Sequence, residues 1–493
     1  MSNRTRILIL VIAAGAYGAC AAFRWHADEH VRRAAGIVLA TLIMWITEVA
    51  PLGIVALAIP VAATAAGLLK WPEAIAAWGD PIIFLFLGAF LLARALDKHG
   101  AFDWFLEARW ARRHDGGSGV GLALPVLAIS GLISTMQNNT AVTAMLLPVV
   151  TAMARRTRVP AIGLLALSYG ATFGGMATPI GTAPNFIGYA AMKAHGADVS
   201  FLSWMRVGVP VWVGTSLIGW AVLALATRFR LAGRIVAVPA APGAEREPRW
   251  VDSLLSSQTA ELTLPAAEPQ ESADDRRAAR GCALAAFAVA AGLWLLPGIL
   301  KGVTDPSDPR RQWIDTYLPE SLVPIAVTWV LFLIRIGPER RTVLDRSDFQ
   351  TLDWDTLFLI AGGLCQGRML ERSGAAAALG QAVAQAELSP LALMFVVGGA
   401  TVLLSELTSN TATAALMVPI AGSLAPAAGA SAPQMIWLVA LSASLGFALP
   451  VSTPPNAIVY GTRLVPLRLM AGAGILVDLL SLIWVVVCVS LLA

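Results

Sequence analysis

Apolar segments long enough to cross a membrane alternate with short polar stretches along almost the whole chain. Segments of about 17–25 apolar residues are typical of membrane-spanning helices, because that length covers the hydrocarbon core of a bilayer. The first, at 7–23, follows two arginines and has features of a signal peptide. Since no cleavage site leads into a soluble domain and more apolar segments follow at once, we interpret it as a retained first helix.

The pattern predicts an all-α polytopic membrane protein with about eleven transmembrane helices, the N-terminus inside and the C-terminus outside. The expected spans lie at 7–23, 34–46, 52–69, 82–96, 163–192, 207–226, 282–300, 322–334, 354–386, 435–460 and 469–492. Two further apolar pairs, at 117–155 and 390–425, are each too short or too interrupted to make two comfortable spans. We predict a re-entrant helical hairpin at each; two ordinary helices are the alternative.

Two polar stretches of nearly the same sequence form the tips of these hairpins. The first ends Gln-Asn-Asn-Thr140 and the second ends Thr-Ser-Asn-Thr411, and each precedes an apolar run that ends in proline. Each is followed by a second polar break, at 178–185 and at 450–456. A single shift of 271 residues places both the tip and the break of the first copy on those of the second. We therefore interpret the chain as a duplicated unit.

Charge at the hairpin flanks predicts how the two units are oriented. Basic residues lie on both sides of the first hairpin, at 112–114 and 155–158, whereas the flanks of the second carry almost none. Positive charge marks the cytoplasmic side of membrane proteins. The hairpins are thus expected to enter from opposite faces, as in inverted-repeat transporters, whose paired interruptions form the binding site. Broken helices at membrane depth must lie inside protein or beside a cavity.

The same pattern divides the chain into five parts. They are N-terminal scaffold helices at 1–77, repeat one at 78–227, a polar linker at 228–280, scaffold helices of the second half at 281–353, and repeat two at 354–493. The linker is rich in Pro, Ala, Glu and Arg and is expected to be a flexible cytoplasmic connection. The loop at 301–320 is expected outside and the basic loop at 335–346 inside, and 101–113 is expected to form an amphipathic helix at the membrane surface.

Composition agrees with an integral membrane protein and narrows its function. Hydrophobic residues make up 57% of the chain, charged residues 13%, and the mean hydropathy is +0.70. The net charge of +4 arises from loops at span ends, so we expect a lipid bilayer and no nucleic acid as a partner. The four cysteines lie apart without metal or disulfide spacing. No acid, base or metal constellation lies at the breaks, so the pattern argues against an enzyme.

The polar tips and breaks have the chemistry of an anion site. Asn, Ser and Thr favour the N-cap of a helix and Pro its first turn, so four helix N-termini can converge, two from hairpins and two from broken helices. Free N–H donors and the helix dipole make such ends suitable for an anion. Uncharged side chains add further donors, at Asn139, Thr140, Thr182, Asn410, Thr411 and Thr453.

The remaining oxygen atoms of the breaks suit a small hard cation such as Na⁺. They belong to Ser134, Ser405 and the backbone near Gly181 and Ser452. Because the clusters contain no Lys, Arg or His, co-bound cations are expected to offset the cost of desolvating a dianion, which predicts symport. Helix packing is the alternative role for such polar residues. For Glu406, we favour a packing role, protonated or paired with a neighbour, over proton coupling.

At these motifs the chain resembles the divalent anion/sodium symporter family, which transports dicarboxylates, citrate and sulfate. The resemblance implies a homodimer whose scaffold and transport domains work by an elevator mechanism, with one Na⁺ near each hairpin tip. It implies a first cation site made of Ser134, Asn138, Asn139 and Gly181, and a second made of Ser405, Ser409, Asn410 and Ser452. Implied substrate contacts are Asn139, Thr140, Thr182, Asn410, Thr411, Thr453 and Pro454.

Two positions depart from the pattern of that family. Asn138 stands at the first Ser of the signature, and Ala183 at the first Pro of the Pro-Pro-Asn break. We expect a secondary active transporter in the cytoplasmic membrane that carries a C4-dicarboxylate such as succinate with Na⁺. Carriage of sulfate or citrate, dicarboxylate exchange and an anion channel remain alternatives.

Overall fold

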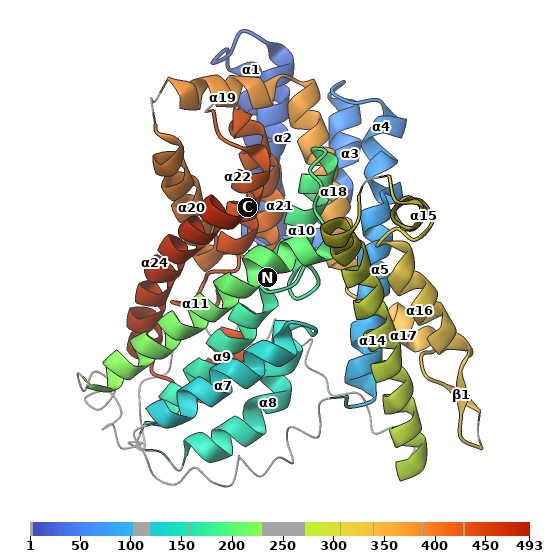
Figure 1. The fold of residues 1–493 in the computed structure, drawn as a ribbon. Coiled ribbons are helices and arrows are strands. Elements are labelled where there is room, and N and C mark those ends of the chain that lie inside the picture. The colour runs from blue at the N-terminus through green and yellow to red at the C-terminus, as the bar shows by residue number, and fades with distance from the viewer. Residues whose placement is uncertain are drawn as a thin grey trace.

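The computed structural model describes residues 3–101, 119–155, 157, 159–228, 272–305, 307–338, 340–385, 388–426 and 429–493. This part of the chain is almost entirely helical (Figure 1). Two short antiparallel strands, β1 (Arg335–Ile336) and β2 (Arg341–Thr342), form a ribbon in which Arg335 pairs with Thr342. The all-α architecture expected from the sequence is confirmed.

The first half of the chain contains the predicted first hairpin and first broken helix. Its helices are α1 (Asn3–Ala22), α2 (Glu29–Ile46), α3 (Leu52–Ala65), α4 (Trp71–Ile75), the 3₁₀ helix η1 (Ala76–Gly79), α5 (Pro81–Lys98), α7 (Val120–Ser134), α8 (Asn139–Ala154), α9 (Pro160–Gly175), α10 (Ala183–Ala194) and α11 (Phe201–Arg228). The expected amphipathic stretch at 101–113 lies, apart from residue 101, outside the described residues.

The second half repeats this order after the linker. Its helices are α14 (Ala273–Val303), α15 (Pro309–Tyr317), α16 (Leu322–Leu333), α17 (Arg346–Gln350), α18 (Trp354–Arg372), α19 (Ala375–Ala384), α20 (Pro390–Leu407), α21 (Asn410–Leu424), α22 (Ala432–Ser442), α23 (Pro454–Gly461) and α24 (Leu467–Leu492). Each of the eleven expected spans falls on a helix or on a run of helices. Six of the described helical segments are long and apolar enough to cross a membrane by themselves.

Three details differ from the expectation. The helix expected from 282 begins at Ala273, because Ser272 caps it and two aspartates occupy its first turn. The expected loop at 301–320 contains α15, which Asp308 caps and Pro309 opens. The helix expected at 354–386 is divided by Gly374, which has a φ of 74° that disfavours residues with a side chain.

The two helices that precede the breaks lie at the centre of the molecule. Every residue of α9 after its first proline is buried, and so are residues 435–442 of α22. A helix that is apolar on all sides belongs in a protein interior. The broken backbone at the ends of these helices is therefore surrounded by protein, as membrane depth requires.

The two repeats interlock. Helix α10 of repeat one packs against α21 and α22 of repeat two, and α23 of repeat two packs against α8 and α9 of repeat one. Hairpin α7–α8 lies at the lower end of the molecule in Figure 1 and hairpin α20–α21 in its upper half. Glycines also permit close packing within repeat one, since a Cβ on Gly174 of α9 would lie 2.0 Å from the backbone oxygen of Gly131 in α7.

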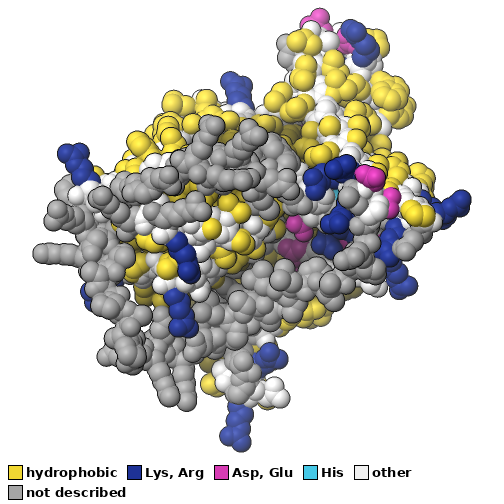
Figure 2. All heavy atoms as spheres, turned by 90° about the horizontal axis from the view of Figure 1, so that it is seen from below, with side chains coloured by type: hydrophobic (Ala, Val, Ile, Leu, Met, Phe, Trp, Pro, Cys, Tyr) yellow, Lys and Arg dark blue, Asp and Glu magenta, His cyan; other side chains and the backbone are white. Residues whose placement is uncertain are grey.

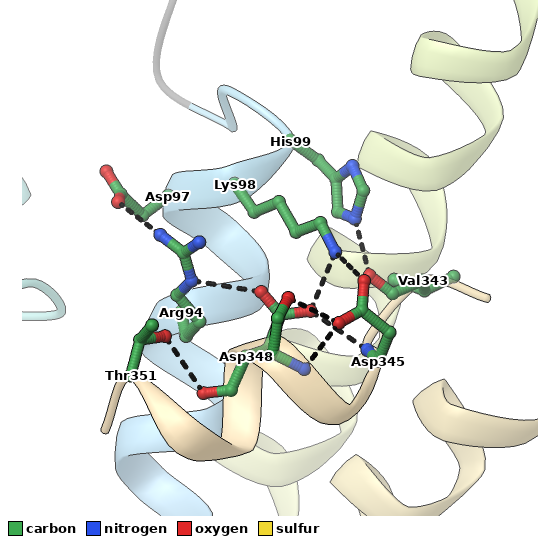
Figure 3. Close-up of polar contacts among 9 residues, drawn as sticks. Arg94, Asp97, Lys98, His99, Val343, Asp345, Asp348 and Thr351 are labelled. Atoms are coloured by element: carbon green, nitrogen blue, oxygen red, sulfur yellow. Dashed lines mark hydrogen bonds and ion pairs between the residues drawn. The ribbon is translucent and has the colours of Figure 1, made fainter. Parts of the chain in front are cut away.

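A charged cluster joins α5 to the segment before repeat two (Figure 3). Asp348, which is fully buried, accepts from Arg94 at 3.0 Å and from Lys98 at 2.7 Å. Lys98 also contacts Asp345 at 2.9 Å, and a ring nitrogen of His99 lies 2.8 Å from the Val343 oxygen. These bonds span about 250 residues of sequence and fix α5 against residues 343–348.

Candidate functional site

The two breaks are built around one asparagine each. The amide nitrogen of Asn185 donates to the backbone oxygens of Gly175 and Thr178, both at 2.8 Å. The amide nitrogen of Asn456 donates to the oxygens of Gly446 and Leu449, both at 3.0 Å. All three positions differ by 271 between the repeats, so the duplication seen in the sequence extends to individual hydrogen bonds.

These asparagines act as clamps on the broken backbone. Each satisfies two carbonyl groups that a regular helix would have paired, which lowers the cost of interrupting a helix inside the protein. Both residues lie at the ends of the breaks expected at 178–185 and 450–456, but no role in the site was predicted for them. The sequence signal that could have identified them is their fixed distance of 46 residues from the hairpin tips (185 − 139 and 456 − 410).

The hairpin tips show the same correspondence. The hydroxyl of Ser134 donates to the side-chain oxygen of Asn139 at 2.7 Å, and that of Ser405 donates to Asn410 at 2.8 Å. The first residue of each tip caps the following helix. Asn138 accepts from the Thr140 nitrogen at 2.8 Å, and Ser409 accepts from the Ala412 nitrogen at 3.3 Å.

Each tip lies against the break of its own repeat. A Cβ on Gly175 would lie 2.5 Å from the Asn139 side-chain oxygen, and a Cβ on Gly181 would lie 2.3 Å from the Gly175 oxygen. Only glycine leaves room for Asn139 to approach this backbone. Ser134, Asn139 and Gly181, three of the four residues expected at the first cation site, are thereby brought together. Asn138 is exposed and its side-chain oxygen serves as the helix cap.

At the second expected cation site, the structure brings Ser405, Asn410 and Ser452 together, with one additional residue beside them. Ser405 donates to the Ala443 oxygen at 2.7 Å and packs beside Gly446, which in turn contacts Ser452. The Ser452 hydroxyl donates to the carboxylate of Glu406 at 2.5 Å. Glu406 therefore lies beside this site.

Glu406 closes the second break through its carboxylate. It accepts from the backbone nitrogens of Ala448 at 2.8 Å and Leu449 at 3.2 Å, in addition to Ser452. Two hydrogen bonds to backbone and one to a hydroxyl satisfy a group that would otherwise be costly inside a membrane protein. The interpretation of Glu406 as a residue paired with its neighbours is consistent with this geometry.

The helices after the breaks begin differently in the two repeats. Thr453 is buried and accepts from the Asn456 nitrogen at 3.3 Å, whereas Thr182 is partly exposed and makes no cap bond with its side chain. Pro454 opens α23 and is exposed, while Ala183 takes that position in α10. Thr140 and Thr411 are partly exposed at the hairpin tips. The convergence of these threonines on one ligand stays a prediction.

One hydrogen bond joins the second break to repeat one. Ser168 of α9 donates to the side-chain oxygen of Asn456 at 2.6 Å. Among the described residues, the corresponding oxygen of Asn185 is buried and has no hydrogen-bond partner. The two asparagines therefore make equivalent hydrogen bonds through their amide nitrogens but differ in the contacts of their side-chain oxygens. All donors and acceptors described here are neutral apart from Glu406, a set suited to oxygen coordination of a hard cation.

Comparison with known proteins identifies the family of this chain. The sequence model of the citrate transporter family matches residues 42–441. The chain belongs to this family. It is a multi-pass membrane transporter and not an enzyme.

Two sodium-dependent dicarboxylate transporters are similar to this chain over most of its length. The sodium-dependent dicarboxylate transporter SdcS of Staphylococcus saprophyticus is 29% identical over 91% of this chain and 83% of its own length. SdcS of Staphylococcus aureus is 28% identical over 90% and 82%. The resemblance to divalent anion/sodium symporters is confirmed. The crystal structure of the YdaH transporter of Alcanivorax borkumensis is 14% identical over 98% of this chain and 96% of its own, with a TM-score of 0.46.

Proposed function

We propose that this transporter carries a C4-dicarboxylate such as succinate across the cytoplasmic membrane together with Na⁺. The observation that supports this most strongly is the duplicated pattern of hairpin tips and clamped breaks, in a chain whose relatives are named sodium-dependent dicarboxylate transporters. Four helices begin at these points, and their N-terminal donors suit an anion.

The proposed role of each residue follows from the chemistry of its side chain. The substrate carboxylates would contact Asn139, Thr140, Thr182, Asn410, Thr411, Thr453 and Pro454. One Na⁺ would bind near each tip, at the two sets of oxygen atoms described above. Since neither cluster contains Lys, Arg or His, the negative charge of the substrate is balanced by the cations and by helix dipoles. Substrate binding without Na⁺ is then weak, which couples the two fluxes.

We further propose an elevator mechanism in a homodimer. The hairpins and broken helices interlock into one body, while the Arg94–Lys98–Asp345–Asp348 cluster fixes α5 to the helices around α14 and α16. This division supports a moving transport domain and a stationary scaffold. Figure 2 shows the lower face of the molecule. Among the described side chains on this face, Lys and Arg predominate over Asp and Glu. That bias supports a cytoplasmic lower face, an inside N-terminus and hairpin one entering from the cytoplasm.

The test is uptake of radiolabelled succinate into proteoliposomes with and without an inward Na⁺ gradient. We expect accumulation only with the gradient, and saturation with succinate concentration. Uptake that is indifferent to Na⁺ would remove the symport proposal, and flux without saturation would favour a channel. Counterflow with internal succinate and no Na⁺ would favour an exchanger.

Citrate is the second candidate substrate, because the matching family is described as citrate transporters. Competition by excess unlabelled citrate, sulfate or succinate against labelled succinate distinguishes the candidates. The proposal expects succinate to compete best. Stronger competition by citrate would reassign the substrate and leave the Na⁺ coupling to be judged separately.

A further inference from the structure

A carboxylate outside the candidate site joins the helices of the scaffold to the end of the first broken helix. Glu320 lies just before α16, and its side chain is only 10% exposed. It accepts hydrogen bonds from the Tyr189 hydroxyl, from the Lys193 ammonium at 3.1 Å and from the Phe201 backbone nitrogen at 3.1 Å. Tyr189 and Lys193 belong to α10, and Phe201 is the first residue of α11. We call these three bonds the Glu320 contact.

The backbone of Glu320 is bonded to a different part of the molecule. Its carbonyl oxygen accepts from the indole nitrogen of Trp294 at 3.1 Å, and Trp294 is a fully buried residue of α14. The main chain of Glu320 is therefore fixed to α14, while its carboxylate bonds to α10 and α11. A residue bonded in this way connects two groups of helices.

Apolar packing surrounds the Glu320 contact. The ring of Trp294 is stacked on that of Phe201, with centroids 5.1 Å apart and an angle of 11° between the planes. Gly298 of α14 lets α11 approach closely, since a Cβ on Gly298 would lie 2.7 Å from the Cβ of Leu202. Surroundings of low polarity strengthen hydrogen bonds electrostatically. The carboxylate thus adds strong, directional bonds to an interface that is otherwise apolar.

The contact lies between the two parts of the proposed elevator. Helices α14 and α16 belong to the proposed scaffold, whereas α10 packs against α21 and α22 and so belongs to the interlocked transport domain. Movement of that domain along α14 would carry Tyr189 and Lys193 away from Glu320. Hydrogen bonds weaken steeply once their atoms separate beyond normal bonding distances, so a displacement of a few ångströms breaks all three.

We propose that the Glu320 contact holds the transport domain in the conformation of this structure, and that it breaks and re-forms once in every transport cycle. The three bonds exist in one conformation and not in the other, which is what allows a residue to set the balance between them. Glu320 is a positioning residue, since among the described residues its bonds go to none of those proposed to bind succinate or Na⁺. The inference rests on the proposed elevator movement.

The first test measures the distance between the two domains and does not need transport. Spin labels are attached to Ala194→Cys, at the exposed end of α10, and Thr316→Cys, at the exposed end of α15, after the four native cysteines are replaced by serine. Pulsed electron double resonance in proteoliposomes then gives the distance distribution. We expect one dominant distance with Glu320 intact and a severalfold larger population of a second distance in Glu320→Gln.

Glu29→Gln is the matched control, because it removes a carboxylate whose partner, Arg33, lies on the same helix. It should leave the distance distribution unchanged. Tyr189→Phe covers the case in which Glu320→Gln does not fold, since it removes one donor and keeps the ring that packs near Trp204. It should shift the distribution in the same direction. An unchanged distribution in folded Glu320→Gln or Tyr189→Phe would overturn the proposal.

The second test asks whether the contact opens during transport. In the same cysteine-free background, Lys193→Cys and Glu320→Cys are joined by a short, reducible bifunctional thiol reagent. We expect cross-linking to stop uptake of labelled succinate and reduction to restore it. The control pair Glu29→Cys and Arg33→Cys, within α2, should keep its uptake when cross-linked. Continued uptake by the cross-linked Lys193→Cys/Glu320→Cys protein would show that the contact stays closed and would refute the proposal.

The two tests also separate this inference from the proposed function. If the wild type does not take up succinate with Na⁺, the proposed function fails. The spin-label distances still decide whether Glu320 holds one conformation, because they are measured without substrate.

Discussion

Replacing the two clamp asparagines by alanine should destabilise the protein unequally. Asn456→Ala removes three hydrogen bonds, two from its amide nitrogen to the second break and one to its oxygen from Ser168. Asn185→Ala removes only two, because the oxygen of Asn185 has no hydrogen-bond partner in the described part of the chain. All these atoms are buried or nearly so, and water cannot replace the lost partners.

The size of the difference follows from the value of each bond. A net hydrogen bond contributes about 1 kcal/mol to stability, and polar contacts between membrane helices average about 0.6 kcal/mol. Asn185→Ala should therefore cost about 1–2 kcal/mol and Asn456→Ala about 2–3 kcal/mol. Ser168→Ala should account for the difference, at about 1 kcal/mol, since it leaves Asn456 with the two bonds that Asn185 has.

The assay is the melting temperature of the purified variants, followed by tryptophan fluorescence. We expect the order wild type, Ser168→Ala, Asn185→Ala and Asn456→Ala, from most to least stable. The double variant Ser168→Ala/Asn456→Ala should melt close to Asn456→Ala, because the two residues share one bond. Equal melting temperatures for the two asparagine variants, or strictly additive effects in the double variant, would refute the reasoning.

Three further predictions concern other parts of the structure. Asp348→Asn should lower stability by about 3 kcal/mol, because it leaves Lys98 and Arg94 without their buried partner. Asp345 is half-exposed, so Asp345→Asn should lower stability by less. Denaturant titration of both variants compares the two losses. Burial by itself would raise the pKa of Asp345, but hydrogen bonds from Ser347 and Lys98 outweigh it and hold the pKa well below its usual range. The charged carboxylate of Asp345 therefore stabilises the fold above about pH 4, and this stabilisation is lost as the pH falls further. The wild type should lose more stability than Asp345→Asn between pH 5 and pH 3. Equal losses in the two proteins would contradict this. Gly174→Leu should abolish uptake of labelled succinate by separating α7 from α9, whereas Gly472→Leu, where a side chain meets open space, should retain it; normal uptake by Gly174→Leu would contradict the close packing.

The features predicted correctly from the sequence are those with a local signal. Hairpins and broken helices were predicted because Asn-Thr tips and Pro-Asn breaks interrupt apolar segments at a fixed spacing. Helix α15 was missed although Asp308 and Pro309 form a recognisable start, because the surrounding loop is polar. The early start of α14 was missed for a similar reason, since Ser272 and its two acidic neighbours were interpreted as the end of the linker.

Contacts between distant segments had no signal in a single sequence. The bonds of Lys98 to Asp345 and Asp348 join residues about 250 positions apart, and each partner alone resembles an ordinary loop charge. The contact of Asp478 with the Phe447 nitrogen likewise depends on how α24 packs against the second break. The candidate residues at the tips could be named in advance because their motif occurs twice. The clamping role of Asn185 and Asn456 became evident only from the carbonyl groups they reach.

The central claim is that the two repeats hold one dianion between their hairpin tips. It is tested most directly by a Thr140→Cys/Thr411→Cys variant in a background whose four native cysteines are replaced by serine. Cross-linking with a short bifunctional thiol reagent should join the two positions within one chain, and succinate with Na⁺ should protect them. Failure to cross-link with both thiols reactive, or no protection by succinate and Na⁺, would contradict the account.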